Sequence, residues 1–317
     1  MTWRWYREAG YLCVWAGIEA GQAAVRVLPR SWAYGLSDTI AGAAFYLCPA
    51  FRRRSLENLQ AALGHTLAPG EAERVVRASL RNFFRAFVEV AAGLTAPPSE
   101  LRSAIPAEGF EHLEAALAKG NGVIAISVHL GNFFLAGARM AAEGYPTHVL
   151  VNPPKNARLA SLMDGYRAKI LQHTIHSRPR QQALRELVEV LRKNEVALVI
   201  ADEYRRGAGV LVPFFERTVL ARRGPATLAL RTGAALVPLY VMRTPDGALR
   251  LVIEPELEIS RGGKSRMAVR EAVLRITGWV ERTVRRHPDQ WNWMTVHWHS
   301  APQRVRGTNG DSCSVYR

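Results

Sequence analysis

The stretch VIAISVHLGNF, residues 123–133, decides the fold because it changes character in its middle. Residues 123–128 form a short apolar run, and the turn signal Asn121-Gly122 stands before it. Such a run is typical of a strand that is buried on both faces of a parallel sheet. The polar loop His129-Leu130-Gly131-Asn132 comes next, and a helical pattern follows to about Ala142. The stretch therefore predicts a strand, a loop and a helix, which is the repeating unit of an α/β fold.

Strand and helix patterns alternate on both sides of this stretch. We expect further strands at 148–151, 196–201, 235–242 and 249–254, and helices at 108–119, 158–172, 181–193, 224–232 and 265–286. A Pro-Asp-Gly turn joins the last two strands as a pair. The alternation predicts one α/β domain over residues 55–302, with helices flanking a mostly parallel central sheet. Residues 303–317 are expected to form a disordered tail.

Two polar clusters stand directly after predicted strands: His129-Leu130-Gly131-Asn132 and Asp202-Glu203. Because working groups in such sheets gather beyond the carboxyl ends of the strands, we expect the clusters to lie together. A histidine there suits a general base, since imidazole titrates near neutral pH. The helix start that follows offers N–H groups to an oxyanion or a phosphate. From the residues alone two plainer interpretations stay open: a structural hydrogen-bonding role for His129, and a loop or cap role for Asp202.

The composition is strongly basic and indicates an anionic partner. The 317 residues carry a formal net charge of +15, and the pI is about 10.4. Nucleic acid, an anionic membrane and an acidic protein or substrate are the usual partners of such a surface. The arginine tracts are short and no nucleic-acid motif accompanies them, so we expect no nucleic-acid partner. The three cysteines are far apart and form no disulfide framework, which favours a reducing compartment.

Residues 1–54 are expected to form amphipathic helices that associate with a membrane. Up to Leu28 the sparse polar residues fall largely on one helical stripe, and Pro29 ends the pattern. The next apolar run, 40–51, is too short to cross a bilayer and ends in Arg52-Arg53-Arg54, which suits an anionic cytoplasmic leaflet. Early Trp and Tyr residues favour a monotopic, interfacial attachment, with a single spanning helix as the fallback. Two ordinary core helices of a soluble protein remain the alternative.

The stretch 123–133 resembles the signature of the late (secondary) acyltransferases of lipid A biosynthesis, which belong with the wider lysophospholipid acyltransferases. In that family the histidine begins an H-x-x-x-x-D/E motif. Further family-like segments follow in order along the chain: Asn58-Leu59, Asn152-Pro153, Arg167, Val199-Ile200-Ala201-Asp202, Val212-Pro213-Phe214-Phe215, Gly224-Pro225-Ala226, Thr232-Gly233-Ala234 and His287-Pro288-Asp289-Gln290-Trp291-Asn292-Trp293. The ordered set covers nearly the whole chain, to about Trp298.

The resemblance implies a glycerolipid-acyltransferase-like fold and the transfer of a fatty acyl chain. The expected donor is a thioester of acyl carrier protein or coenzyme A, and the expected acceptor is a hydroxyl or amine of a membrane lipid or glycolipid. It also implies His129 as the base, a place at the cytoplasmic face of the inner membrane, and no metal or other cofactor. The substrate-binding positions that it implies are Gly131, Asn132, Arg167 and Arg223. Surface solubility explains the arginines almost as well.

The departure from the motif lies five residues after the histidine, where Phe134 replaces the acid. Phenylalanine accepts no hydrogen bond, so it cannot orient the imidazole or stabilise the imidazolium. We expect Asp202 or Glu203 to fill this role, with Asn132 as a poorer acceptor. The rival hypothesis is a catalytically weakened or inactive relative that binds lipid or an acyl carrier as an accessory protein.

Two histidine pairs and the Trp-rich C-terminal segment have spacings that suggest metal binding and base stacking, but we expect structural roles for them. His297-x-His299 on a strand and His173-x-x-His176 on a helix have the spacing of metal ligands, but neither has carboxylate or cysteine support nearby. We therefore expect no metal. The residues Trp291, Trp293 and Trp298 are expected to anchor the chain in the core or in a membrane rather than to stack on bases.

Overall fold

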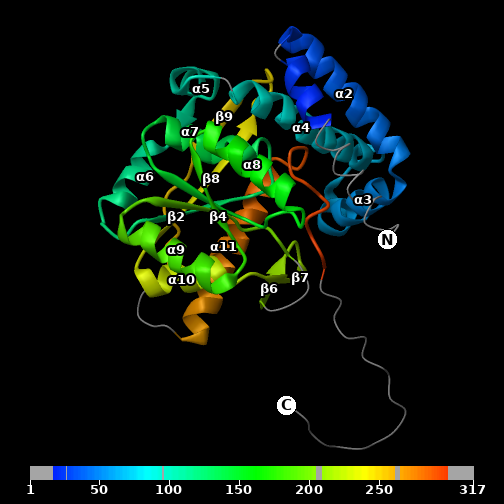
Figure 1. Ribbon diagram of the computed structural model, residues 1–317. Coiled ribbons are helices and arrows are strands. Elements are labelled where there is room, and N and C mark those ends of the chain that lie inside the picture. Colours follow the sequence, from blue (N-terminus) through cyan, green and yellow to red (C-terminus); the bar gives the residue numbers. More distant parts are fainter. Residues whose placement is uncertain (1–16, 26, 95, 205–208, 261–264, 299–317) are drawn as a thin grey trace, which may run out of the picture.

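A mostly parallel sheet forms the centre of the molecule (Figure 1). The computed structural model describes residues 17–25, 27–94, 96–204, 209–260 and 265–298. In this part of the chain the main sheet has seven strands in the order β1-β9-β8-β2-β5-β3-β4. Their bounds are β1 (Ala107–Glu108), β2 (Val123–Ser127), β3 (Thr147–Val151), β4 (Gln172–His176), β5 (Val196–Ile200), β8 (Ala235–Arg243) and β9 (Leu249–Ile253). Neighbours pair in parallel except β8 and β9, which are antiparallel, so the predicted sheet is confirmed.

Four strands of the described structure are missed by the sequence patterns. One is β4, so the prediction that His173 and His176 lie on a helix is wrong. As an edge strand that pairs only with β3, β4 is half-exposed and has too few apolar residues for a clear period. The others are β1 and both members of a separate antiparallel pair, β6 (Val210–Phe214) and β7 (Arg217–Ala221).

Helices cover both faces of the sheet and divide its core into two layers. On one face lie α6 (Phe110–Leu117), α7 (Ala136–Ala142) and α8 (Ala157–Lys169), and on the other lie α9 (Arg180–Arg192), α10 (Gly224–Thr232) and α11 (Arg266–Arg286) (Figure 1). Successive residues of β2 serve the two layers in turn. Val123 and Ala125 pack in the first layer, whereas Ile124 and Ile126 pack in the second. This division explains why the strand shows no polar alternation.

The pairing of β2 with β5 brings the two polar clusters to one level. The strands run in parallel, and Ser127 lies beside Ile200. His129 and Asp202 each follow two residues later. Both side chains therefore emerge at the carboxyl edge of the sheet, as the alternation of strands and helices predicts.

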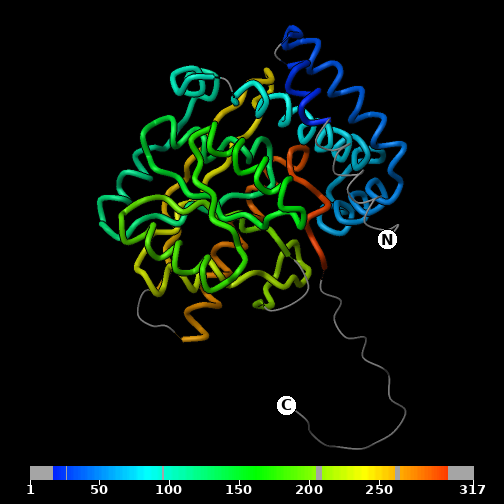
Figure 2. Tube along the Cα trace, viewed as in Figure 1, coloured from blue at the N-terminus to red at the C-terminus, as the bar shows by residue number. Residues whose placement is uncertain are grey.

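The N-terminal helices pack together at one corner of the molecule (Figure 2). They are α2 (Arg30–Leu47), α3 (Pro49–Leu63) and α4 (Glu71–Gly93), with a 3₁₀ turn at Gly64–Thr66. The short α5 (Pro98–Ala104) lies apart from them and packs against α7. α2 packs along α4 and buries one face, in which residues recur at every fourth position: Ala33, Ser37, Ala41 and Phe45. α3 and α4 also join the core layer that contains α9 to α11. The boundary expected between residues 54 and 55 falls inside α3.

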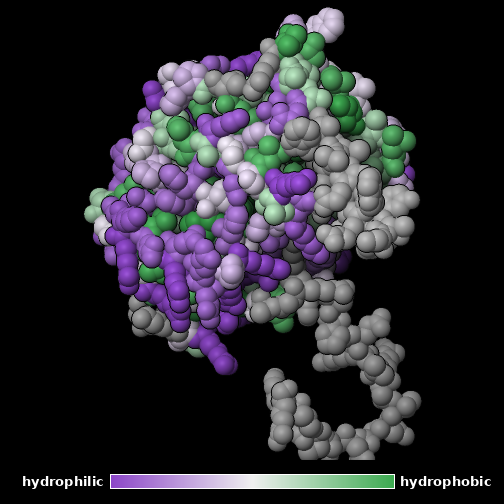
Figure 3. Space-filling model, in the orientation of Figure 1, coloured by the Kyte–Doolittle hydropathy of each residue, from purple (hydrophilic) through white to green (hydrophobic). Residues whose placement is uncertain are grey.

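A second face of α2 is apolar and exposed. Trp32 is 70% exposed and Leu47 is 78% exposed, with Leu36 and Ile40 between them on the same stripe. Figure 3 shows hydrophobic atoms gathered over this helix. Among the described residues, no helix is both long and apolar enough to span a membrane. The helix expected at 1–28 lies mostly outside the described residues, and the tail expected at 303–317 lies wholly outside them.

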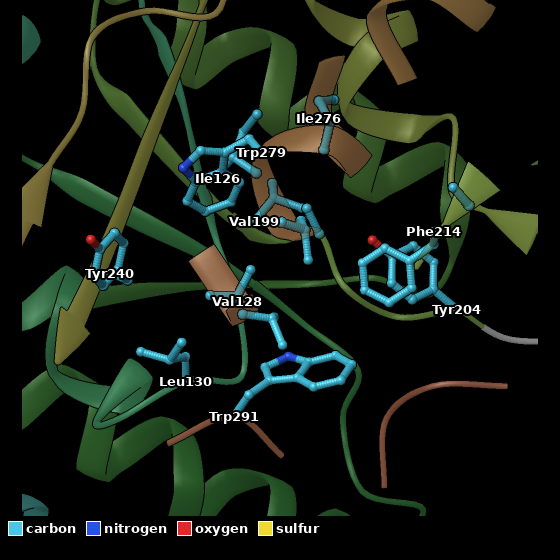
Figure 4. Close-up of a cluster of buried hydrophobic side chains, with 14 of the residues drawn as sticks. Ile126, Val128, Leu130, Val199, Tyr204, Phe214, Tyr240, Ile276, Trp279 and Trp291 are labelled. Carbon is cyan, nitrogen blue, oxygen red and sulfur yellow. The ribbon is translucent and has the colours of Figure 1, made fainter. Parts of the chain in front are cut away.

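The segment that follows α11 runs between the N-terminal helices and the sheet (Figure 2). Its backbone carbonyls accept hydrogen bonds from three side chains of α3 and α4: Asn58, Ser79 and Asn82. Trp291 and Trp293 are fully buried, and Figure 4 shows Trp291 beside Leu130 in the apolar cluster. Of the two places proposed for these indoles, the structure therefore selects the core.

Candidate active site

His129 and Asp202 form the centre of the site. The Nδ1 atom of His129 lies 2.7 Å from Oδ1 of Asp202, and the backbone N–H of His129 donates to Oδ2 at 2.8 Å. The indole Nε1 of Trp291 donates to the same Oδ2 at 2.7 Å. The carboxylate has no exposed surface. It therefore contacts the imidazole in a dry environment, where charge-assisted hydrogen bonds are strong.

The charge on Asp202 is maintained by its hydrogen bonds. Burial raises the pKa of this carboxyl group, but the adjacent His129 and the indole of Trp291 lower it further, so that the net shift is downward. The group is ionised at neutral pH. An ionised carboxylate against Nδ1 selects the tautomer with its proton on Nδ1, which leaves Nε2 as the basic nitrogen.

The loop that carries His129 is fixed on both sides by backbone hydrogen bonds. Gly131 donates to the carbonyl of Gln290 at 3.0 Å, and Asn132 donates to the carbonyl of Val241 at 3.0 Å. Gly131 has a φ of 54°, and a Cβ at this position would lie 2.0 Å from the Val241 oxygen. Only glycine fits here. The N–H groups of Gly131 and Asn132 are therefore engaged in holding the loop.

A buried polar network lies beneath the loop. The amide of Asn132 donates to Oε2 of Glu89 at 2.7 Å, so its side chain is directed at α4 rather than at the imidazole. Glu89 also contacts Arg243 at 2.6 Å, and both side chains are 7% exposed. Tyr34 donates to Glu89 at 3.0 Å. Burial, and then the adjacent Glu89, raise the pKa of Tyr34 to about 12, so this hydroxyl keeps its proton.

Sequence reasoning missed Glu89 and Arg243. The available signal was a single acid inside the apolar end of a helix, FVEVAAG at residues 87–93. A charge in such a place is rarely buried without a partner. Its partner stands more than 150 residues away, at the end of β8, and no spacing rule connects the two.

Phe134 lies five residues after His129, in the 3₁₀ turn η2 (Phe133–Leu135). Its ring centroid is 4.0 Å from that of Phe133 and 5.5 Å from that of Phe87 on α4. The ring of Phe133 in turn lies 4.8 Å from the imidazole, edge to face. The position of the family's acid is thus occupied by part of an aromatic group.

The remaining expected site residues lie at three separate places in the fold. Glu203 follows Asp202 and is partly exposed. Arg167, on α8, contacts Oδ1 of Asp164 at 3.0 Å. The other oxygen of Asp164 contacts His176 at 2.9 Å, at the end of β4. Arg223 is exposed and directly precedes α10. The structure therefore brings His129 and Asp202 into contact, whereas Arg167 lies on α8 and Arg223 lies directly before α10.

The histidine pairs lie in other surroundings. His173 and His176 are three positions apart on a strand, so their side chains leave opposite faces. His297 contacts the guanidinium of Arg54, and His299 lies outside the described residues. Within the described ranges, no group of three or more His, Cys, Asp or Glu residues is arranged to hold a metal ion.

Comparison with known proteins gives a match along almost the entire chain. Residues 4–300 match the family model described as bacterial lipid A biosynthesis acyltransferase. Phosphatidylinositol mannoside acyltransferase of Mycolicibacterium smegmatis is 27% identical over 289 residues, or 89% of this chain and 90% of the relative. The protein of that name from Mycobacterium tuberculosis H37Rv is 28% identical over 285 residues, or 88% of this chain and 86% of the relative. Lipid A biosynthesis lauroyltransferase of Escherichia coli K12 is 24% identical over 200 residues, or 62% of each chain.

Proposed function

The chain belongs to the bacterial lipid A biosynthesis acyltransferase family, and we propose that it moves a fatty acyl chain from a thioester donor to a lipid-borne acceptor with His129 as the general base. Family membership makes it an acyltransferase enzyme of the lipid A or glycolipid type. The observation that carries the finer proposal is the contact between His129 and the buried Asp202. It supplies the acid that Phe134 lacks.

The proposed reaction begins with the acceptor. A hydroxyl or amine of the acceptor gives its proton to Nε2 of His129 while its oxygen or nitrogen attacks the thioester carbonyl carbon. Asp202 stabilises the imidazolium that forms, as the aspartate does in a serine-protease triad. The tetrahedral intermediate then expels the thiolate, which takes the proton back from Nε2. The products are the acylated acceptor and the free thiol.

The other expected site residues support this step indirectly. Gly131 and Asn132 use their backbone N–H groups to hold the loop, so we assign them to positioning the base rather than to contact with the oxyanion. Arg167, on α8, and Arg223, directly before α10, are proposed to attract the anionic groups of the substrates. Glu203 is proposed as a minor contributor, because Asp202 holds the contact with Nδ1.

The donor is proposed to be acyl carrier protein or coenzyme A, and the acceptor a glycolipid or phospholipid of the inner membrane. The relatives are named for phosphatidylinositol mannoside and for lipid A, which favours a glycolipid. No nucleic-acid partner and no cofactor enter the proposal. The rival hypothesis of an inactive accessory protein rested on Phe134, and the Asp202 contact weakens its basis.

Transfer is tested with purified protein, a labelled acyl thioester and a membrane lipid extract, followed by lipid mass spectrometry. Wild type is expected to produce an acylated lipid, and His129→Ala is expected to lose turnover by at least about a thousandfold. Equal turnover in the two proteins would remove His129 from the mechanism. Binding of lipid or carrier without any transfer by wild type would favour the accessory role.

We propose that the protein attaches to the cytoplasmic face of the inner membrane through the exposed stripe of α2. The stripe presents Trp32, Leu36, Ile40 and Leu47, and an arginine tract follows in α3, an arrangement that suits an anionic interface. Leu36→Glu with Ile40→Glu should reduce sedimentation with anionic vesicles. Met267→Glu is the matched control, because this exposed apolar residue lies on α11. Equal losses in both variants would argue against attachment through α2.

A further inference from the structure

We propose that an aromatic strip beside His129, formed by Phe133, Phe134, Phe83 and Phe87, binds the hydrocarbon chain of the acyl donor, and that Phe134 helps to set which chain lengths are accepted. This inference rests on the proposed acyl transfer and adds a binding surface and a specificity residue to it.

The strip is continuous from the imidazole to the surface. The ring of Phe133 is 4.8 Å from the ring of His129 and 4.0 Å from the ring of Phe134. The ring of Phe134 lies 5.5 Å from Phe87 and 6.5 Å from Phe83. Phe83 and Phe87 contact each other at 5.1 Å. Each step is within the range of direct aromatic contact.

One side of this strip is open to the surroundings. Phe87 is 49% exposed, and the other three rings are partly exposed. The polar side chains by which α4 contacts α2 are others: Arg77, Arg85 and Glu89. Four contiguous large aromatic side chains that remain partly exposed are typical of a binding surface for an apolar ligand.

The position of the strip favours the donor chain over the chains of the acceptor. In a thioester, the reacting carbonyl carbon is the first carbon of the fatty chain. Methylene groups therefore begin directly next to the base. In a glycolipid or phospholipid acceptor, a polar head separates the reacting hydroxyl from any hydrocarbon. A strip that begins at the imidazole of His129 consequently fits the chain that is being transferred.

The aromatic strip also explains why the motif acid is replaced by phenylalanine at position 134. A carboxylate at position 134 would place a charge within the strip, between Phe133 and Phe87, where an apolar chain would have to desolvate it. Because Asp202 already orients His129, this position is released from that duty. Phenylalanine keeps the path apolar.

The test measures kcat/KM for a series of saturated acyl thioesters of increasing length. In wild type, each methylene that contacts the strip should raise kcat/KM about fourfold, which corresponds to about 0.8 kcal/mol per buried CH₂. Phe134→Ala and Phe87→Ala should flatten this dependence, so that their loss relative to wild type grows with chain length. Phe134→Leu, which keeps an apolar side chain, should retain most of it.

Phe110→Ala is the matched control, because Phe110 is also a partly exposed ring stacked on an aromatic residue, Tyr145, but lies on α6. It should keep the wild-type dependence on chain length. A loss in Phe134→Ala that is the same at every chain length, or a dependence as steep as in wild type, would overturn the inference.

A non-reactive thioether analogue separates this inference from the proposed function. If wild type transfers no acyl chain but binds longer thioethers more tightly, and Phe134→Ala abolishes that trend, the strip is supported and the transfer is not. If transfer proceeds while thioether affinity is independent of chain length in wild type, the strip is excluded and the transfer stands.

Discussion

The imidazole of His129 has two different kinds of neighbour: a charged carboxylate and aromatic rings. On one side Asp202 is fully buried and accepts hydrogen bonds from the His129 backbone and from Trp291 in addition to its contact with the ring. On the other side Phe133 and Phe134 are apolar and partly exposed. The charge of Asp202 is thus buried and hydrogen-bonded, whereas the rings of Phe133 and Phe134 remain partly exposed. The pairing of β2 with β5 supplies the acid, so the acid does not depend on the spacing within the motif.

The largest effect is expected from removing the negative charge of Asp202 beside His129. Asp202→Asn should lower kcat by about ten-thousandfold, the loss seen when the equivalent aspartate of a serine-protease triad is neutralised. The amide favours the wrong imidazole tautomer and cannot stabilise the imidazolium. Steady-state kinetics measures the loss in kcat, and circular dichroism checks that the variant is folded. Glu203→Gln at the same strand end is the comparison, and an equal loss there would show that the acid was assigned to the wrong residue.

The next prediction concerns the network that supports the loop from below. Glu89→Ala should destabilise the fold by about 3–5 kcal/mol, because Arg243 would be left buried without its ionic partner. Urea unfolding gives this value. Exchanging the exposed pair Arg53 and Glu57 for alanines should cost less than about 1 kcal/mol. A similar small cost for Glu89→Ala would mean that the network is open to water.

Trp291→Phe removes one hydrogen bond to the carboxylate of Asp202, the one donated by the indole. Losing a hydrogen bond to a charged group should cost about 1.5–3 kcal/mol at neutral pH. The pKa of Asp202 is lowered in the fold, so its stabilising contribution is present above its ordinary pKa of about 3.9 and is lost as the pH falls through the lower folded value. Without the indole donor the folded pKa rises. Acid unfolding followed by fluorescence should therefore begin at a higher pH in the variant than in wild type, and coincident curves would contradict this.

The smallest effect is expected from restoring the motif acid. Phe134→Glu should not raise kcat, because Asp202 already holds Nδ1 of His129. A loss of up to about tenfold is expected from the charge placed among apolar rings, since one tenfold step is about 1.4 kcal/mol. The assay is turnover with one acyl thioester. A clear gain in turnover would mean that Asp202 is a poor substitute and that the enzyme is weakened by its phenylalanine.

The sequence predicts those parts of the site that depend on local order. The buried run before His129 and the run before Asp202 both read as strands, and a parallel sheet then places their ends together. The contact between Nδ1 and the carboxylate follows from that placement. The donor Trp291 could be assigned to the core but not to Asp202, because the two are 89 residues apart.

The missed features share a physical cause. The polar strand β4 gains its form from pairing with β3, not from its own period. Glu89 and Arg243 stabilise each other only because α4 crosses the end of β8 in three dimensions. From the sequence alone, Phe134 indicates only the loss of the motif acid. In the structure its ring packs among other aromatic rings, Phe83 and Phe87 of α4. Tertiary contacts decide all three cases.

The backbone hydrogen bonds that hold the His129 loop also determine when that loop can be completed during protein synthesis. Gly131 donates to Gln290, and Asn292 donates to the carbonyl of His129, so the loop is closed by residues translated long after it. At about 5–20 residues per second, the clasping segment follows roughly 8–30 s behind the histidine. Until then the loop that carries His129 lacks the backbone partners in residues 290–292 that hold it in the finished fold.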